Sequence, residues 1–194
     1  LKAQALVVGY DFRFGRARGG TVDVVRQHKP ELDVFQVSAL QGETEIVSST
    51  RIRQLVLDGN VAQAAQYLSR PHSVSGVVVP GDQRGRTLGF PTANILSSTE
   101  LIPAMGVYAV HIQINQRPPQ KAIVNLGTRP TFDGVNFTIE AHIFDFDEDI
   151  YGNQVRILFH ERIRAEKQFN MVVDFKDQIQ KDIEKAKTIL NSVS

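Results

Sequence analysis

Three regularly spaced glycines precede a short polar motif near the middle of the chain. They are Gly81, Gly85 and Gly89, and Pro91-Thr92-Ala93-Asn94 follows them. Glycine lets a loop turn sharply and bring backbone N–H groups close to an anion such as phosphate. Mg²⁺ binds one or two protein oxygens and completes its shell with water and phosphate oxygens. The motif therefore predicts a site for phosphate and Mg²⁺, with Thr92 and Asn94 as metal ligands; a simple barrel corner is the alternative.

A glutamate lies in a later segment in which polar and apolar residues alternate strictly. Between Phe137 and Phe144, the polar residues Thr138, Glu140 and His142 alternate with Ile139, Ala141 and Ile143. Successive side chains of a strand point to opposite faces, so Glu140 should point away from the apolar side. A carboxylate in that position can act as a general base or can form an exposed cross-strand ion pair. His142 has no second histidine at metal-ligand spacing, so we expect it to be structural.

Composition sets broad limits on the partners of this chain of 194 residues. The 22 basic and 21 acidic side chains give a formal charge of +1, which provides no field that favours nucleic acid or an anionic membrane. There are no cysteines, so disulfides and thiolate chemistry are excluded. No apolar run approaches the ~20 residues of a membrane span. We expect a cytoplasmic protein with small-molecule substrates and no obligate protein partner.

The elements that must position these residues fall into two parts. Ala5–Val8, a helix over Thr21–His28 and Val34–Val37 predict a βαβ unit with parallel strands. Two short helices follow, the first over Arg51–Leu57, and Ser69-Arg70-Pro71 marks the expected boundary between domains 1–70 and 71–194. Beyond Pro71 the pattern becomes alternating, which predicts an antiparallel barrel. Turn residues predict a loop at Gly127–Gly134, and an amphipathic helix around Phe175–Leu190 should pack on the barrel.

The second part contains several motifs in a defined order, beginning with the run from Gly76 to Asn94. The later motifs are Gly106-Val107-Tyr108-Ala109, Asn125-Leu126-Gly127-Thr128-Arg129-Pro130-Thr131-Phe132, Glu140-Ala141-His142-Ile143, Asp149-Ile150-Tyr151-Gly152 and a terminal helix with Gln178-Ile179 and Asp182-Ile183. In sequence and order these motifs resemble the kinase module of bacterial bifunctional riboflavin kinase/FAD synthetases. The resemblance covers about Pro71 to Leu190.

The resemblance implies a six-stranded antiparallel barrel with a C-terminal helix that phosphorylates riboflavin to FMN with Mg²⁺ and ATP. Thr92 and Asn94 would then serve Mg²⁺ and the ATP phosphates, and Glu140 would be the catalytic base. Gly81, Gly85 and Gly89 would belong to the ATP-binding loop. Arg129, Pro130 and Thr131 would belong to a flap over the flavin and the nucleotide. A long hairpin loop held by Pro130 is the alternative, and both can be true.

The first part resembles the end of the FMN adenylyltransferase module of the same enzymes, a Rossmann-like α/β domain. The resemblance rests on Val7–Gly15 and on Ser48–Arg53, where Ser49, Thr50 and Arg53 match a motif that handles the triphosphate at a helix N-terminus. A plain helix cap is the alternative. The H-x-G-H motif of that module is missing, so we expect a truncated α/β remnant without adenylyl transfer. FAD synthesis by a longer protein and a non-catalytic flavin- or nucleotide-binding barrel remain as alternative functions.

Overall fold

The computed structural model describes residues 3–41, 46–81, 85, 89–131, 134–167, 169 and 171–193. The chain forms two compact units, Leu1–Ser48 and Ser49–Ser194. In the first unit, β1 (Ala5–Gly9) and β2 (Asp33–Val37) pair in parallel, and α1 (Val22–His28) connects them. The hydroxyl of Thr21 accepts a hydrogen bond from the backbone N–H of Val24 and so caps α1. The predicted βαβ unit is therefore confirmed.

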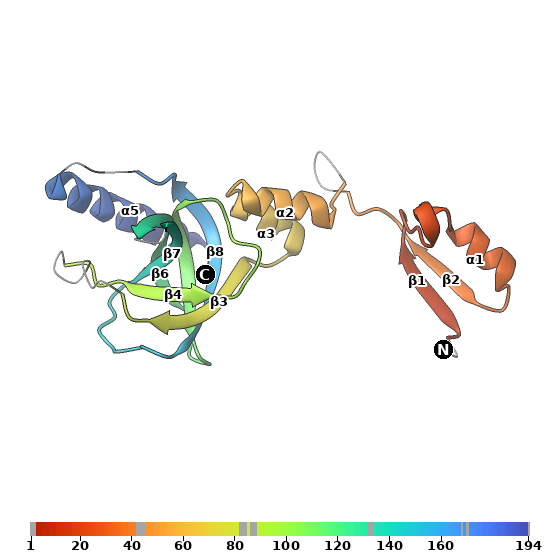
Figure 1. Ribbon diagram of the computed structural model, residues 1–194, viewed down its shortest axis with the longest axis horizontal. Helices are drawn as coiled ribbons and strands as arrows, with labels where there is room; N and C mark the ends of the chain where they lie inside the picture. The colour runs from red at the N-terminus through yellow and green to blue at the C-terminus, as the bar shows by residue number, and fades with distance from the viewer. Residues whose placement is uncertain are drawn as a thin grey trace. The chain divides into compact units, whose positions relative to one another are not determined.

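The second unit is built around a closed antiparallel barrel with the strand order β3-β4-β7-β6-β5-β8 (Figure 1). The strands are β3 (His72–Val79), β4 (Ala93–Ser97), β5 (Gly106–Ile114), β6 (Gln120–Thr131), β7 (Gly134–Ile143) and β8 (Gln154–Arg164). Closure leaves no free sheet edge, because every strand has a neighbour on each side. The predicted six-stranded barrel is confirmed.

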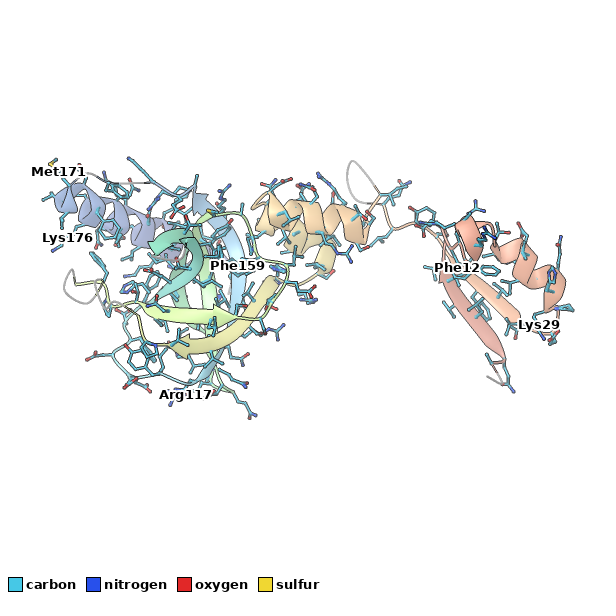
Figure 2. The ribbon with its side chains drawn as sticks, in the orientation of Figure 1. Phe12, Lys29, Arg117, Phe159, Met171 and Lys176 are labelled. Carbon is cyan, nitrogen blue, oxygen red and sulfur yellow. The ribbon has the colours of Figure 1, made fainter. Side chains whose placement is uncertain are left out.

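Alternation along each strand fills the barrel interior. On β5, Tyr108, Val110, Ile112 and Ile114 belong to the interior cluster, as the sequence pattern predicts. Phe159 of β8, labelled in Figure 2, is fully buried in this cluster. It packs edge-on against Tyr108, with ring centroids 5.3 Å apart. Residues of the opposite parity, including Glu140, therefore lie on the outer face of the barrel.

A long C-terminal helix, α5 (Val172–Ser192), covers part of this outer face. Its buried residues Ile183, Ala186 and Leu190 pack on Val107 of β5 and Ile123 of β6. Asp182 is also buried, but Arg164 donates to both of its carboxylate oxygens and Gln178 donates to one. Because the buried charge is fully paired, it holds α5 at the end of β8 without leaving an unsatisfied carboxylate.

Two short helices close one end of the barrel. They are α2 (Ser49–Leu57) and α3 (Val61–Leu68), and Val61 is fully buried in the interior cluster of the barrel. Between them, Gly59 has a φ of +82°, and a Cβ at this position would lie 2.9 Å from the hydroxyl of Tyr108 and 2.9 Å from Cδ of Arg162. Both helices therefore belong to the barrel unit in this structure.

Gly59→Ala should lower the free energy of unfolding by about 3 kcal/mol. The left-handed backbone accounts for about 1–2 kcal/mol and overpacking against Tyr108 and Arg162 for the remainder. Gly152→Ala is the matched control, because Gly152 also has a positive φ, +75°, but no atom within 4 Å of an added Cβ. Urea unfolding of both variants gives the comparison. Equal losses would show that the tight contact at Gly59 contributes nothing.

One sequence prediction about the barrel is wrong. The segment Gly127–Gly134 reads as a loop, yet β6 and β7 continue through it as a paired hairpin, with Gly127 opposite Thr138 and Thr131 opposite Gly134. Pro130 is tolerated opposite Val135, because the pairing of β6 with β5 stops at Leu126. Beyond that residue the described part of β6 pairs with β7 alone, and the position without an N–H can face away from β7. Phe132 and Asp133 lie outside the described residues.

Two histidines form a contact that the sequence did not reveal. Nδ1 of His111 on β5 lies 2.8 Å from Nε2 of His160 on β8, and the two rings meet edge-on. One neutral ring donates this hydrogen bond and the other accepts it. Burial lowers the pKa of His111, assisted by the positive charge of Lys121. Burial also lowers the pKa of His160, to about 4, with a smaller contribution from His111.

The histidine pair should make the protein less stable as the pH falls from about 6.5 to about 4. Histidines of the unfolded chain bind protons near pH 6.5, whereas those of the folded protein do so only at lower pH, so the unfolded state binds more protons in this window. Urea unfolding at a series of pH values measures the effect. His160→Gln should flatten the dependence, and His28→Gln, at an exposed position on α1, should not. A curve that His160→Gln leaves unchanged would contradict this assignment.

Candidate active site

The barrel brings the predicted metal ligand Asn94 next to the predicted base Glu140. Asn94 on β4 and Glu140 on β7 are directly opposite in the antiparallel register. Ala93 and Ile95 pack against the barrel interior, so Asn94 points to the outer face, as Glu140 does. Directly opposite residues have Cβ atoms about 4.5–5.5 Å apart. The carboxylate of Glu140 and the carboxamide of Asn94, which are far apart in the sequence, are therefore neighbours on the outer surface of the barrel.

The glycine loop closes over the polar motif. A Cβ at Gly81 would overlap the carboxamide of Asn94, and a Cβ at Gly85 would overlap the carbonyl oxygen of Phe90 and lie 3.1 Å from Oγ1 of Thr92. The N–H of Phe90 donates to the carbonyl of Gly85 at 2.9 Å, which closes this turn. The loop backbone can approach Thr92 and Asn94 this closely only because these positions carry no side chain. Residues 82–84 and 86–88 lie outside the described part.

His142 fixes the start of this motif from the next strand. Nδ1–H of His142 donates to the carbonyl of Pro91 at 2.8 Å. Its ring also packs against Phe90 and Phe144, with centroid distances of 5.9 Å to each. The contacts agree with the structural role expected for His142, because they hold the backbone that presents Thr92.

A cavity of about 410 Å³ adjoins Thr92 at the end of the barrel where β3 ends and β8 begins. One wall is apolar and comes from the barrel, and the other comes from the loop before β8. The lining residues are Val78, Pro91, Thr92, Ala93, Ala141, Ile143, Phe146, Asp147, Glu148, Asp149, Ile150 and Tyr151. The sequence did not indicate that this loop lines a cavity, because the loop comes close to Thr92 only in the folded barrel.

The donor set around Thr92 and Asn94 fits Mg²⁺. The described residues contain no cluster of three or more histidine, cysteine, aspartate or glutamate side chains that would hold a metal by themselves. A hydroxyl and a carboxamide oxygen suit Mg²⁺, which draws its remaining ligands from water and phosphate. The backbone of the glycine loop lies close to both side chains, at Gly81 and Gly85, so a phosphate bound by the loop would lie near them.

Two other groups of predicted site residues are placed differently. Arg129, Pro130 and Thr131 lie on the β6–β7 hairpin, and the positions of their side chains are not described. Ser49, Thr50 and Arg53 lie on α2, of which Ser49 and Thr50 form the first turn. The connection between α2 and α3 contacts the barrel at Gly59, near the end of β8 and the start of β5. The cavity lies at the other end of β8, near its start. These three residues are therefore not part of the Thr92 site.

Comparison with known proteins identifies the family. The riboflavin kinase (Flavokinase) family model matches residues 68–190. The bifunctional riboflavin kinase/FMN adenylyltransferases of Escherichia coli K12 and Bacillus subtilis 168 are 37% and 35% identical to this chain. The matches cover 94% and 96% of this chain and 59% and 60% of those proteins. The chain thus spans about three fifths of the length of these relatives.

A solved structure is also similar over most of the chain. It is titled a macrolide-efflux protein from Streptococcus pneumoniae, with a TM-score of 0.88 and 39% identity over 95% of this chain and 60% of that one. No helix in the described ranges has the length and apolar character that crossing a membrane requires. The family match spans all six barrel strands and α5 as far as Leu190, and it confirms the family that the sequence motifs predict. The chain therefore belongs to the riboflavin kinase family.

Proposed function

We propose that this chain transfers the γ-phosphoryl group of ATP to the ribityl 5′-hydroxyl of riboflavin and so produces FMN. The observation that carries the proposal is the direct pairing of Asn94 with Glu140 across β4 and β7. It joins an oxygen ligand suited to Mg·ATP and a carboxylate suited to remove a proton. Family membership supports the same reaction.

Each side chain has a separate task in the proposed reaction. Thr92 and Asn94 would hold Mg²⁺, which when bound neutralises charge on the phosphates. Backbone N–H groups of the glycine loop would contact the phosphate oxygens. Glu140 would accept the proton of the 5′-hydroxyl as the hydroxyl oxygen bonds to the γ-phosphorus, and the bond from that phosphorus to the bridging oxygen of ADP would break. Positioning and charge neutralisation supply most of the acceleration in such transfers.

The cavity next to Thr92 is the proposed site for the nucleoside part of ATP. Its apolar wall, from Val78 to Ile143, suits a flat base. The opposite wall carries Asp147, Glu148 and Asp149, whose charges repel phosphate. The triphosphate would therefore extend from the cavity past Thr92 toward Gly81 and Gly85.

The kinase domain proposed for this activity comprises residues 71–194. Residues 1–70 would be the end of an FMN adenylyltransferase domain, whose last two helices, α2 and α3, belong to the compact unit of the barrel. The relatives are named for both activities, and Ser49, Thr50 and Arg53 match the adenylyltransferase motif. This chain carries no H-x-G-H motif, so we propose that it makes FMN without making FAD. FAD synthesis by a longer protein is the second candidate.

We further propose a cytoplasmic location, with no nucleic acid or protein partner required.

One assay separates these functions. The chain is incubated with riboflavin, ATP and Mg²⁺, and FMN and FAD are separated by chromatography. FMN without FAD, lost when EDTA replaces Mg²⁺, is the expected result. FAD would support the second candidate. Binding of flavin and ATP without either product would leave a non-catalytic binding barrel.

A further inference from the structure

We infer that Asn125 is a positioning residue for Glu140, an inference that rests on the proposed kinase function. Asn125 of β6 is directly opposite Glu140 of β7, and Glu140 is in turn directly opposite Asn94 of β4. The three residues thus form one row across three neighbouring strands. Glu140 stands in the middle of this row, with a carboxamide on each side.

The side chain of Asn125 points to the same face as Glu140. Its neighbours Val124 and Leu126 are fully buried in the barrel interior, so Asn125 has the opposite parity and lies on the outer face, where it is half-buried. Its Cβ lies about 4.5–5.5 Å from that of Glu140, as directly opposite residues do. A carboxamide N–H can therefore reach the Glu140 carboxylate.

A second carboxylate borders the same carboxamide. Gly127 is the next outward position on β6, and a Cβ there would lie 3.2 Å from Nδ2 of Asn125 and would overlap a carboxylate oxygen of Glu166. The absence of a side chain at Gly127 thus lets Glu166 come close to Asn125. The carboxamide has two N–H donors, and it lies between Glu166 on one side and Glu140 on the other.

Two ionisable side chains at neighbouring positions have partners of their own. His142, two residues along β7, donates to the carbonyl of Pro91. Arg164 at the end of β8 is paired with Asp182 at 2.8 Å. Asn125 offers neutral N–H donors directly opposite Glu140 and near Glu166.

This arrangement suits a general base. A general base must hold a carboxylate oxygen within hydrogen-bond reach of the proton that it removes. A hydrogen bond from Asn125 would fix the direction of the Glu140 carboxylate toward the substrate hydroxyl. Loss of Asn125 should therefore impair turnover much more than the binding of Mg·ATP.

Two substitutions test the inference through kinetics. Asn125→Ala should lower kcat by roughly tenfold and leave KM for ATP within about twofold, because it removes the orienting donor. Asn125→Asp keeps the size of the side chain but removes the N–H donors, so kcat should fall as it does in Asn125→Ala. Gln113→Glu is the matched control, since it makes the same amide-to-carboxylate change on the outer face of β5, opposite Arg156.

Crystal structures separate failure of the inference from failure of the proposed function. The direction of the Glu140 carboxylate is compared in the wild type, Asn125→Ala and Gln113→Glu. The carboxylate should turn away from its wild-type direction in Asn125→Ala and keep that direction in Gln113→Glu. If the wild-type chain makes no FMN, the kinase proposal fails, and the structures still show whether Asn125 orients Glu140. An unchanged direction in Asn125→Ala overturns the inference, as does wild-type kcat in that variant.

Discussion

Glu140→Gln should lower the rate of riboflavin phosphorylation by about 10²-fold or more, with the binding of Mg·ATP nearly unchanged. Glutamine keeps the shape of the side chain and the register with Asn94 but cannot accept the proton of the attacking hydroxyl. General-base catalysis of this kind typically contributes about 10²–10⁴-fold. Initial rates of FMN formation and calorimetric titration with ATP measure the two effects separately.

Glu161→Gln is the control for this substitution. Glu161 is an exposed glutamate on β8, opposite Ala109 of β5, so the same chemical change occurs on the same barrel away from Asn94. Its turnover should match that of the wild type. If Glu140→Gln also retained wild-type turnover, Glu140 would not be the base, and positioning and metal binding would have to account for the whole rate.

Gly81→Ala should lower kcat/KM for ATP by about 10²-fold. The added methyl group would overlap the carboxamide of Asn94, which must then rotate or shift. A displacement of about 1 Å in a group that positions substrate can cost on the order of 10²-fold in rate. The effect should appear in ATP kinetics and in the concentration of Mg²⁺ required for half-maximal rate.

Gly19→Ala controls for the substitution itself. Gly19 has right-handed helical dihedral angles, and the nearest atom to an added Cβ is 3.6 Å away, so alanine fits without displacement. This variant should have wild-type kinetics. Urea unfolding of Gly81→Ala shows whether the fold survives. A stable Gly81→Ala protein with normal ATP kinetics would mean that Asn94 does not need its observed position.

Local patterns in the sequence predicted much of the barrel and of its site. Alternation on β5 and β7 gave the buried and exposed faces, including the outward direction of Glu140, because side-chain parity depends only on strand geometry. The glycine spacing indicated a loop that approaches a ligand closely. It did not reveal that the Asn94 carboxamide leaves no room for a side chain at Gly81, since that contact depends on how the loop folds back onto β4.

Features that depend on distant parts of the chain could not be predicted in this way. The register that places Glu140 between Asn94 and Asn125 joins three separate segments. The cavity wall at Asp147–Tyr151 and the histidine pair on β5 and β8 likewise arise only when the barrel closes. The hairpin at Gly127–Thr131 was predicted wrongly because its glycine and proline are common in loops, whereas pairing with β7 accommodates both.

Because Asn94 and Glu140 are directly paired, catalysis also depends on which side chains of β7 face outward. Inserting one residue into β7 before Glu140 would exchange the inner and outer sets of side chains along the strand and turn the carboxylate toward the interior. Inserting residues in the turn between β5 and β6, around Gln116, leaves the β4–β7 pairing untouched. Sequences of this barrel can therefore vary in length at that turn, whereas the count of residues leading into Glu140 is constrained by the chemistry as strictly as the glutamate itself.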